Sequence, residues 1–369
     1  MSVRTPAPTR LPVTAVPSAR WWSRLALPVA ALWSLAYLVL GLRWLQGGSG
    51  NPADPAVDPA LLLSVLEPLG PTRAAALYTG LAAAGLLLAA VMAARRPRPG
   101  RAGAADRVAA GAAVVLGVVL AVVLTDFRIL ANLGYLPMLP LAALGLLPGG
   151  GGIPALSWPD VNLLVLMAAG LAWVGAGICH GGAVNRYDGD RGRPWWTAPA
   201  AVARWGRLAT YVAMVVPLGY AATRYAWALG IPFGVRQELL DELGPGVLAG
   251  AGLATGAVVG AVLTWGLLRP WGTTVPRWLP GVGGRRVPVA VAVAPASLVA
   301  AAVTSAGLMF WRFLLADRFG EYFPGTEADV AAWLPELFWP VWGVALAAAT
   351  YAYVLRRRAQ PRGRTSPLS

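Results

Sequence analysis

The sequence contains no lysine, one cysteine, one histidine and little charge of any kind. All 30 basic residues are arginine. The lysine of a nucleotide-binding phosphate loop is therefore missing, and lysine-based covalent catalysis is excluded. Cys179 alone cannot form an intrachain disulfide, and His180 alone cannot supply a two-histidine metal or haem site. We expect no cofactor and no metal.

The apolar content of the chain indicates a membrane protein. Hydrophobic residues make up 57% of the 369 residues and charged residues 12%, about half the charge of a soluble domain. Apolar runs recur near the length of about 20 residues that a bilayer requires. We predict an all-α, multi-pass protein of the bacterial plasma membrane, with an eight-span bundle over residues 24–355. The spans are expected at 25–45, 74–94, 108–128, 161–179, 208–229, 247–268, 288–311 and 335–355.

The placement of arginine predicts the orientation of this bundle. The tails at 1–23 and 356–369, with Arg24 and the loops on the same side, hold 23 of the 30 arginines. The other side holds seven arginines and 13 acidic residues. Because arginine-rich loops stay in the cytoplasm, we expect both termini there, with lipid rather than nucleic acid as the partner. A further apolar stretch, 129–147, contains two prolines and is expected to be a re-entrant or interfacial segment on the outer face.

Weak internal repeats suggest that helical hairpins were duplicated in parallel. "RPWWT" at 193–197 and "RPWGT" at 269–273 precede the fifth and seventh spans. The outer loops 58–70, 234–244 and 326–338 each have the pattern of a short amphipathic helix. The sixth span carries Gly252, Gly256 and Gly260 at the four-residue spacing of tightly packed membrane helices, which predicts a position near the bundle centre.

Four spans that run outward end in an arginine beside an aromatic residue: Arg43, Arg128, Arg224 and Arg312. One interpretation is structural, since a cation is stabilised at a helix carboxyl end and acidic residues begin the returning spans. The other is that these arginines converge on an anionic lipid or a lipid-linked substrate, which their planar donors would suit. Asp126 lies two residues from Arg128 and belongs to the same candidate site.

Prolines suggest where a ligand site would reach into the membrane. Pro217 and Pro295 lie at matching depth in spans five and seven, and helices broken at such positions line the sites of many transporters. Tyr220, Thr223 and Ser305 lie near them. The candidate ligand-binding residues are therefore Arg128, Arg224, Arg43, Arg312, Asp126, Tyr220, Thr223 and Ser305, and no catalytic residue is predicted.

Three functions are compatible with these patterns. The first is transport or handling of an anionic or lipid-like ligand, which predicts a cavity between spans five and seven. The second is an enzyme acting on a lipid-linked substrate, with acids drawn from Asp126, Asp160, Glu238, Asp241 and Glu336. The third is a non-catalytic scaffold or assembly subunit, which predicts no such cavity and an exposed face of small residues.

Overall fold

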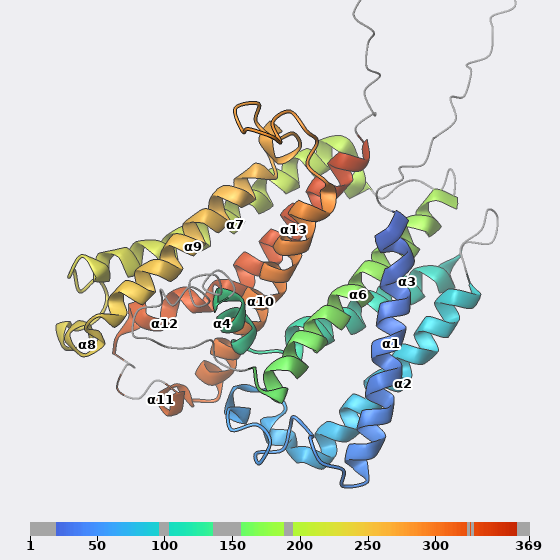
Figure 1. The fold of residues 1–369 in the computed structure, drawn as a ribbon, viewed down its shortest axis with the longest axis horizontal. Coiled ribbons are helices and arrows are strands. Elements are labelled where there is room, and N and C mark those ends of the chain that lie inside the picture. Colours follow the sequence, from blue (N-terminus) through green and yellow to red (C-terminus); the bar gives the residue numbers. More distant parts are fainter. Residues whose placement is uncertain are drawn as a thin grey trace, which may run out of the picture.

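A computed structural model of the chain describes residues 20–95, 103–135, 156–187, 195–322, 325 and 328–359 (Figure 1). Within these ranges the chain is helical and forms no strand apart from one isolated bridge between Thr274 and Arg286. Seven helices are long and apolar enough to cross a membrane. The predicted all-α class is therefore confirmed, and the seven apolar helices are consistent with a multi-pass membrane protein, in which backbone groups bond within each helix.

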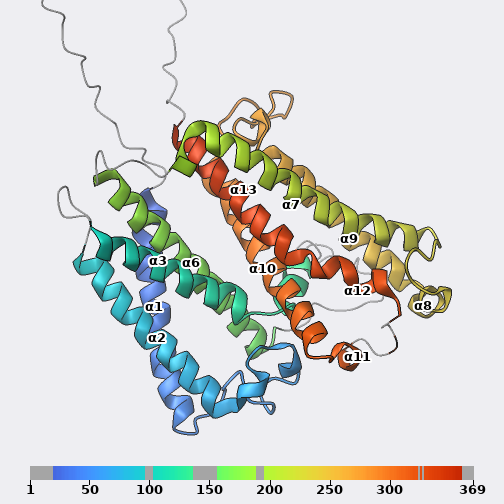
Figure 2. The ribbon, with the colours of Figure 1, turned by 180° about the vertical axis from the view of Figure 1, so that it is seen from behind.

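The long helices form two groups of four, drawn in blue to green and in yellow to red (Figures 1 and 2). In the first half, α1 packs against α2, α2 against α3, α3 against α6 and α6 against α1, which closes a ring. A five-residue π-helical turn, η4, continues α3. The bounds are α1 Arg20–Leu45, α2 Gly70–Ala94, α3 Ala104–Val118, η4 Val119–Val123 and α6 Trp158–Tyr187.

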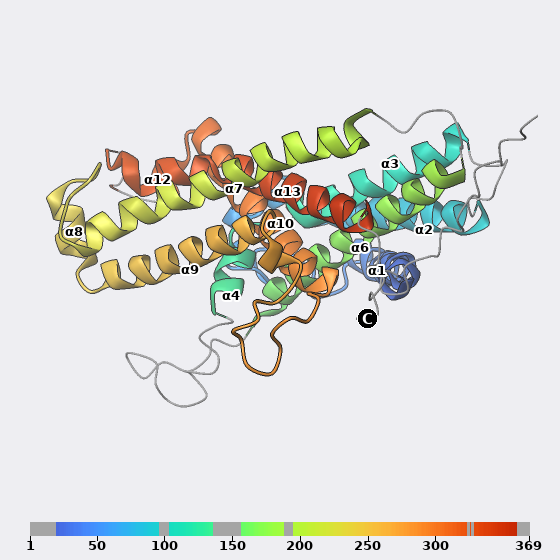
Figure 3. The ribbon, with the colours of Figure 1, turned by 90° about the horizontal axis from the view of Figure 1, so that it is seen from above.

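The second half repeats three of these contacts. Helix α7 packs against α9 and α13, and α10 packs against α13, but α9 has no comparable contact with α10. The sixth predicted span, α9, therefore lies beside α7 at the edge of the molecule and not at the centre (Figure 3). The bounds are α7 Pro199–Ala228, α9 Gly246–Gly266, α10 Val289–Leu315 and α13 Trp339–Ala359.

Each of the eight predicted spans falls on helical residues, with three differences. The span predicted at 335–355 begins in α12, Val330–Leu337, and continues in α13. The span predicted at 208–229 lies in α7, which is not among the seven membrane-length apolar helices because three arginines lower its hydropathy. The span predicted at 108–128 stops five residues early, at Val123. Of the predicted segment 129–147, the first residues belong to α4, Arg128–Tyr135, and 136–147 lie outside the described residues. Residues 1–19 and 360–369 of the two tails also lie outside them.

Short helices gather at one end of the bundle, which we call the loop end (Figures 1 and 2). The opposite end, where α1 begins and α13 finishes on Arg356–Arg358, we call the arginine-rich end. The three outer loops expected to be helical do contain short helices. The loop end holds η2 Leu61–Leu63, η3 Glu67–Leu69, α8 Gln237–Leu243, α11 Phe319–Tyr322 and α12 Val330–Leu337.

The first half is tightly packed. Trp33 stacks on Tyr37 with 4.7 Å between ring centroids, and the Tyr37 hydroxyl donates to Asn162 Oδ1 at 2.6 Å. Helices α3 and α6 approach so closely that a Cβ added to Gly170 would lie 2.5 Å from the carbonyl oxygen of Gly117. The second half joins the first through α10, which contacts η4, α4 and α6.

Candidate functional site

The third span loses its regular helix at the boundary between the halves. The π turn η4 ends at Val123, and an irregular segment then leads into α4. Within it, Thr125 and Asp126 are buried, with exposed fractions of 5% and 1%. The Thr125 hydroxyl donates to the carbonyl oxygen of Ala121 at 2.8 Å, and its oxygen forms a second hydrogen bond with the Ser305 hydroxyl on α10 at 2.9 Å. The irregular turn thus brings polar groups of the first half against the second.

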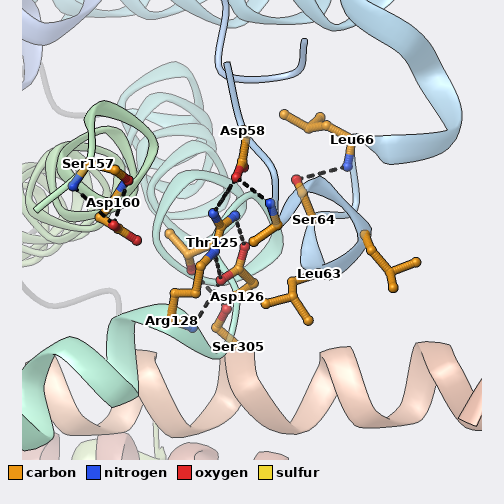
Figure 4. Close-up of polar contacts among 12 residues, drawn as sticks. Asp58, Leu63, Ser64, Leu66, Thr125, Asp126, Arg128, Ser157, Asp160 and Ser305 are labelled. Carbon is orange, nitrogen blue, oxygen red and sulfur yellow. Dashed lines mark hydrogen bonds and ion pairs between the residues drawn. The ribbon is translucent and has the colours of Figure 1, made fainter. Parts of the chain in front are cut away.

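Arg128 binds two carboxylates at this boundary (Figure 4). Its Nη1 donates to both oxygens of Asp58, at 2.8 and 3.0 Å. Its Nη2 and Nε donate to Asp126, at 2.8 and 3.0 Å. Asp58, Asp126, Arg128, Thr125 and Ser305 form what we call the junction network. Both carboxylates are almost completely buried, and the guanidinium of Arg128 is the counter-ion of each.

Arg312 approaches the same region from α10. Its Nη2 donates to the carbonyl oxygens of Leu62 and Leu63, at 3.2 and 2.7 Å. These carbonyls close the short helix η2, where backbone acceptors lack helical partners. Arg312 therefore holds the loop after α1 against the second half.

Arg224 occupies a separate site on α7, where α12 crosses it. Its Nη2 donates to Glu336 Oε1 at 2.7 Å and to the carbonyl oxygen of Ala332 at 3.1 Å. Its Nη1 donates to the carbonyl oxygen of Ala331 at 3.0 Å. The guanidinium carbon lies 4.7 Å from the ring centroid of Tyr220 and 4.2 Å from that of Trp227. With 8% of its surface exposed, Arg224 clamps α12 to α7.

The prolines do not break the helices that carry them. Helix α7 continues through Pro217 and α10 through Pro295. The expectation of proline-broken spans five and seven is wrong, because each proline removes one backbone donor and the packed helix on either side persists. The helix is irregular in span three instead, where the sequence contains no proline between 104 and 128.

The predicted site residues fall into three places. Arg128, Asp126, Ser305 and Arg312 meet at the boundary between the halves. Tyr220, Thr223 and Arg224 lie together on α7, where the Thr223 hydroxyl donates to the carbonyl oxygen of Tyr220. Arg43 is exposed at the end of α1 and donates to Ser49 Oγ at 3.3 Å.

Asp58 belongs to this site but was not among the residues predicted from the sequence. Its only signal was its position as the first acidic residue of the outer loop 58–70.

Four of the five acids considered for an enzyme have separate local partners. Asp126 and Glu336 bind arginines, at the junction and on α7 respectively. Asp160 accepts the Ser157 hydroxyl at 2.6 Å, and Asp241 accepts the Gln237 amide at 3.0 Å. In the described part of the chain no cluster of three or more histidine, cysteine or acidic residues could hold a metal ion.

A further ion pair ties α8 to α12. Asp329 is fully buried and accepts the backbone N–H of Arg236 at 2.7 Å and its Nη2 at 2.8 Å. The hydrogen bond from Arg236 holds the pKa of the Asp329 carboxyl below its ordinary value, against the opposing effect of burial. The two residues directly precede α8 and α12, so their pair fixes the entry to both short helices.

Two surface cavities lie on the second half. An apolar groove of about 600 Å³ runs between α7 and α13 and is lined by Trp205, Leu208 and Val344 among others. A cavity of about 310 Å³ lies at the arginine-rich end, between α7, the end of α9 and α13. Neither is lined by the predicted site residues.

Comparison with protein families, with curated proteins and with solved structures finds no match for this chain. The function must therefore be argued from the geometry of the chain itself.

Proposed function

We propose that the chain is a non-catalytic subunit of a membrane complex, and that it presents α9 to a neighbouring transmembrane helix. The observation that carries this proposal is the exposure of α9. In its most apolar stretch 11% of the residues are buried, compared with 33 to 56% in the other six membrane-length helices.

The exposed helix has the composition of a helix–helix interface. Gly252, Gly256 and Gly260 recur every four residues, and a Cβ added to any of them would meet no described atom within 4 Å. Small residues at this spacing let two helix backbones approach closely in a bilayer, which strengthens their van der Waals packing. Such a stripe is complementary to itself across a two-fold axis, so we assign a second copy of the chain as its partner.

Transport of an anionic ligand and catalysis on a lipid-linked substrate have less support. Arg128 and Arg224 already donate to buried carboxylates within the chain, and a ligand would have to displace those partners. The charged groups considered for either function lie near helix ends, whereas ion-coupled transporters commonly use a carboxylate deep in the membrane.

The proposal includes eight spans, with α7 as the fifth and both termini in the cytoplasm. In its support, the beginning of α1 and the end of α13 lie at the same end of the molecule (Figure 1). At about 1.5 Å per residue, the 30 residues of α7 also exceed the thickness of the hydrocarbon core. The contacts that recur between the halves favour duplication of a four-helix unit.

Native mass spectrometry of protein extracted gently from membranes tests the assembly. We expect wild type at the mass of a dimer, and Gly256→Leu at the mass of a folded monomer. Gly80→Leu is the matched control, since Gly80 is also exposed and open, on α2. A monomeric wild type, or equal loss of dimer in both variants, would refute the proposal.

A further inference from the structure

The cavity at the arginine-rich end is lined by arginines that have no carboxylate partner among the described residues. Three guanidinium groups from three elements line it: Arg207 from α7, Arg269 after α9 and Arg356 from α13. Tyr211 and Trp265 complete its wall. No carboxylate lines this cavity, and within the described residues none of its three arginines forms an ion pair.

The protein uses only part of the hydrogen-bonding capacity of these arginines. Arg207 Nε donates to the carbonyl oxygen of Ala203 at 3.1 Å, and Arg356 Nη2 donates to that of Leu267 at 2.7 Å. Arg356 Nε is buried and has no acceptor among the described residues. Arg269 stacks its guanidinium 4.3 Å from the ring centroid of Trp265. Among the described residues, the remaining donors of the three guanidinium groups have no acceptor.

We propose that this cavity binds a phosphate-bearing anion, and specifically the phosphate of an anionic lipid headgroup. Planar guanidinium groups bind phosphate oxygens through paired hydrogen bonds. A phosphate in the cavity would accept hydrogen bonds from guanidinium donors that face it and offset the mutual repulsion of the three arginines. The inference does not depend on pairing through α9.

The position of the cavity favours a lipid over a free phosphate. Tyr211 and Trp265 are half-exposed aromatic residues that adjoin the arginines, as in the aromatic belt of a membrane interface. Basic pockets between helices on the cytoplasmic side are suited to anionic headgroups, which are concentrated in that leaflet. The proposed orientation places the arginine-rich end on this side.

Native mass spectrometry from vesicles of defined composition tests the site. One sample contains phosphatidylcholine with phosphatidylglycerol, and a second contains phosphatidylcholine alone. We expect one phosphatidylglycerol molecule to be retained by wild type and at least tenfold less by Arg269→Gln and Arg356→Gln. Arg204→Gln is the matched control: Arg204 is exposed on the same end of α7 but does not line the cavity. The control is expected to retain the lipid.

A second experiment distinguishes binding of a lipid headgroup from binding of free phosphate. Delipidated protein is heated in detergent with and without inorganic phosphate, and the rise in Tm is compared between wild type and Arg269→Gln. A rise confined to wild type, without retained phosphatidylglycerol, would support the anion site but assign it to a soluble phosphate. The Arg269 side chain is exposed and donates no hydrogen bond among the described residues, so its replacement is expected to leave the fold intact. Equal retention by Arg204→Gln and Arg269→Gln, or no response in either arm, would overturn the proposal.

Discussion

In the first half of the molecule α2 packs against both α1 and α3, whereas its counterpart in the second half, α9, packs on α7 and lacks the contact with α10. The other three contacts recur in both halves. The ring of helix–helix contacts is therefore closed in the first four-helix unit and open in the second. In a bilayer, lipid surrounds both units, so exposure of apolar residues is expected in each. What distinguishes α9 is that its exposed surface includes the stripe of Gly252, Gly256 and Gly260, which suits close packing against another helix.

The halves also differ in how they hold an arginine near the loop end. Arg128 is bound by two carboxylates, and its site joins the halves. Arg224 is bound by one carboxylate, two carbonyl oxygens and two aromatic rings, and its site holds α12 to α7. The same residue type thus serves as a counter-ion in one half and as a clamp in the other.

Loss of the junction arginine is expected to have the largest effect. Arg128→Ala leaves two buried carboxylates without a counter-ion and should lower the free energy of unfolding by about 3–5 kcal/mol. Asp58→Asn leaves one carboxylate for one arginine and should cost clearly less. Thermal unfolding in detergent, followed by circular dichroism, measures both. A larger effect from Asp58→Asn would contradict the counter-ion role.

Loss of the clamp in the second half is expected to rank next. Arg224→Ala removes the partner of buried Glu336 and should cost about 3 kcal/mol, whereas Glu336→Gln keeps an acceptor and should cost about 1 kcal/mol. Arg43→Ala, at an exposed helix end, should change stability by less than about 0.5 kcal/mol. The same unfolding assay measures these effects. Equal effects of Arg224→Ala and Arg43→Ala would mean that Arg224 contributes no more to stability than an exposed arginine.

A pair of glycine substitutions compares the packing of the two halves directly. Gly170→Ala forces a methyl group against the backbone of α3 and should cost about 1–3 kcal/mol. Gly256→Ala meets open space in the chain and should leave the stability of the monomer unchanged or raise it by up to about 1 kcal/mol. Unfolding of dilute protein in detergent distinguishes them. A destabilised Gly256→Ala monomer would mean that α9 is packed within its own chain.

The smallest effect is expected at Asp329, which fixes the short helices of the second half and whose contribution to stability depends on pH. Because the folded pKa of Asp329 lies below its ordinary value, the carboxylate stabilises the fold above pH about 4. This contribution is lost as the pH falls through the folded pKa. Asp329→Asn should therefore lower Tm by a few degrees, by the same amount from pH 5 to pH 8, and the difference from wild type should shrink below pH 4. A difference that grows on acidification would have the wrong sign.

The positions of the helices could be predicted from the sequence, because the bilayer sets the length of an apolar run. The partner of each arginine could not be predicted from the sequence. Asp58 lies 70 residues from Arg128, and Glu336 lies 112 residues from Arg224. Such pairs depend on which spans become neighbours, and local patterns do not determine that.

Two further features had no usable sequence signal. The π turn η4 lies in the apolar stretch "VLAVV", which is equally compatible with a regular α-helix. The glycines of α9 would look the same whether they faced a helix of this chain or of another. Their four-residue spacing identifies a packing face, and only the contacts of α9 with its neighbours place that face at the edge of the molecule.

Disulfide cross-linking in native membranes tests the exposed α9 face most directly. Cys179→Ser first removes the native cysteine, and Gly256→Cys or Gly80→Cys then supplies a new one. With mild oxidant, Gly256→Cys should give a product of twice the 38.3 kDa chain mass, and Gly80→Cys should stay at that of one chain. If Gly256→Cys stays at the mass of one chain, or if both variants cross-link equally, the exposed face of α9 does not pair with a second copy of the chain.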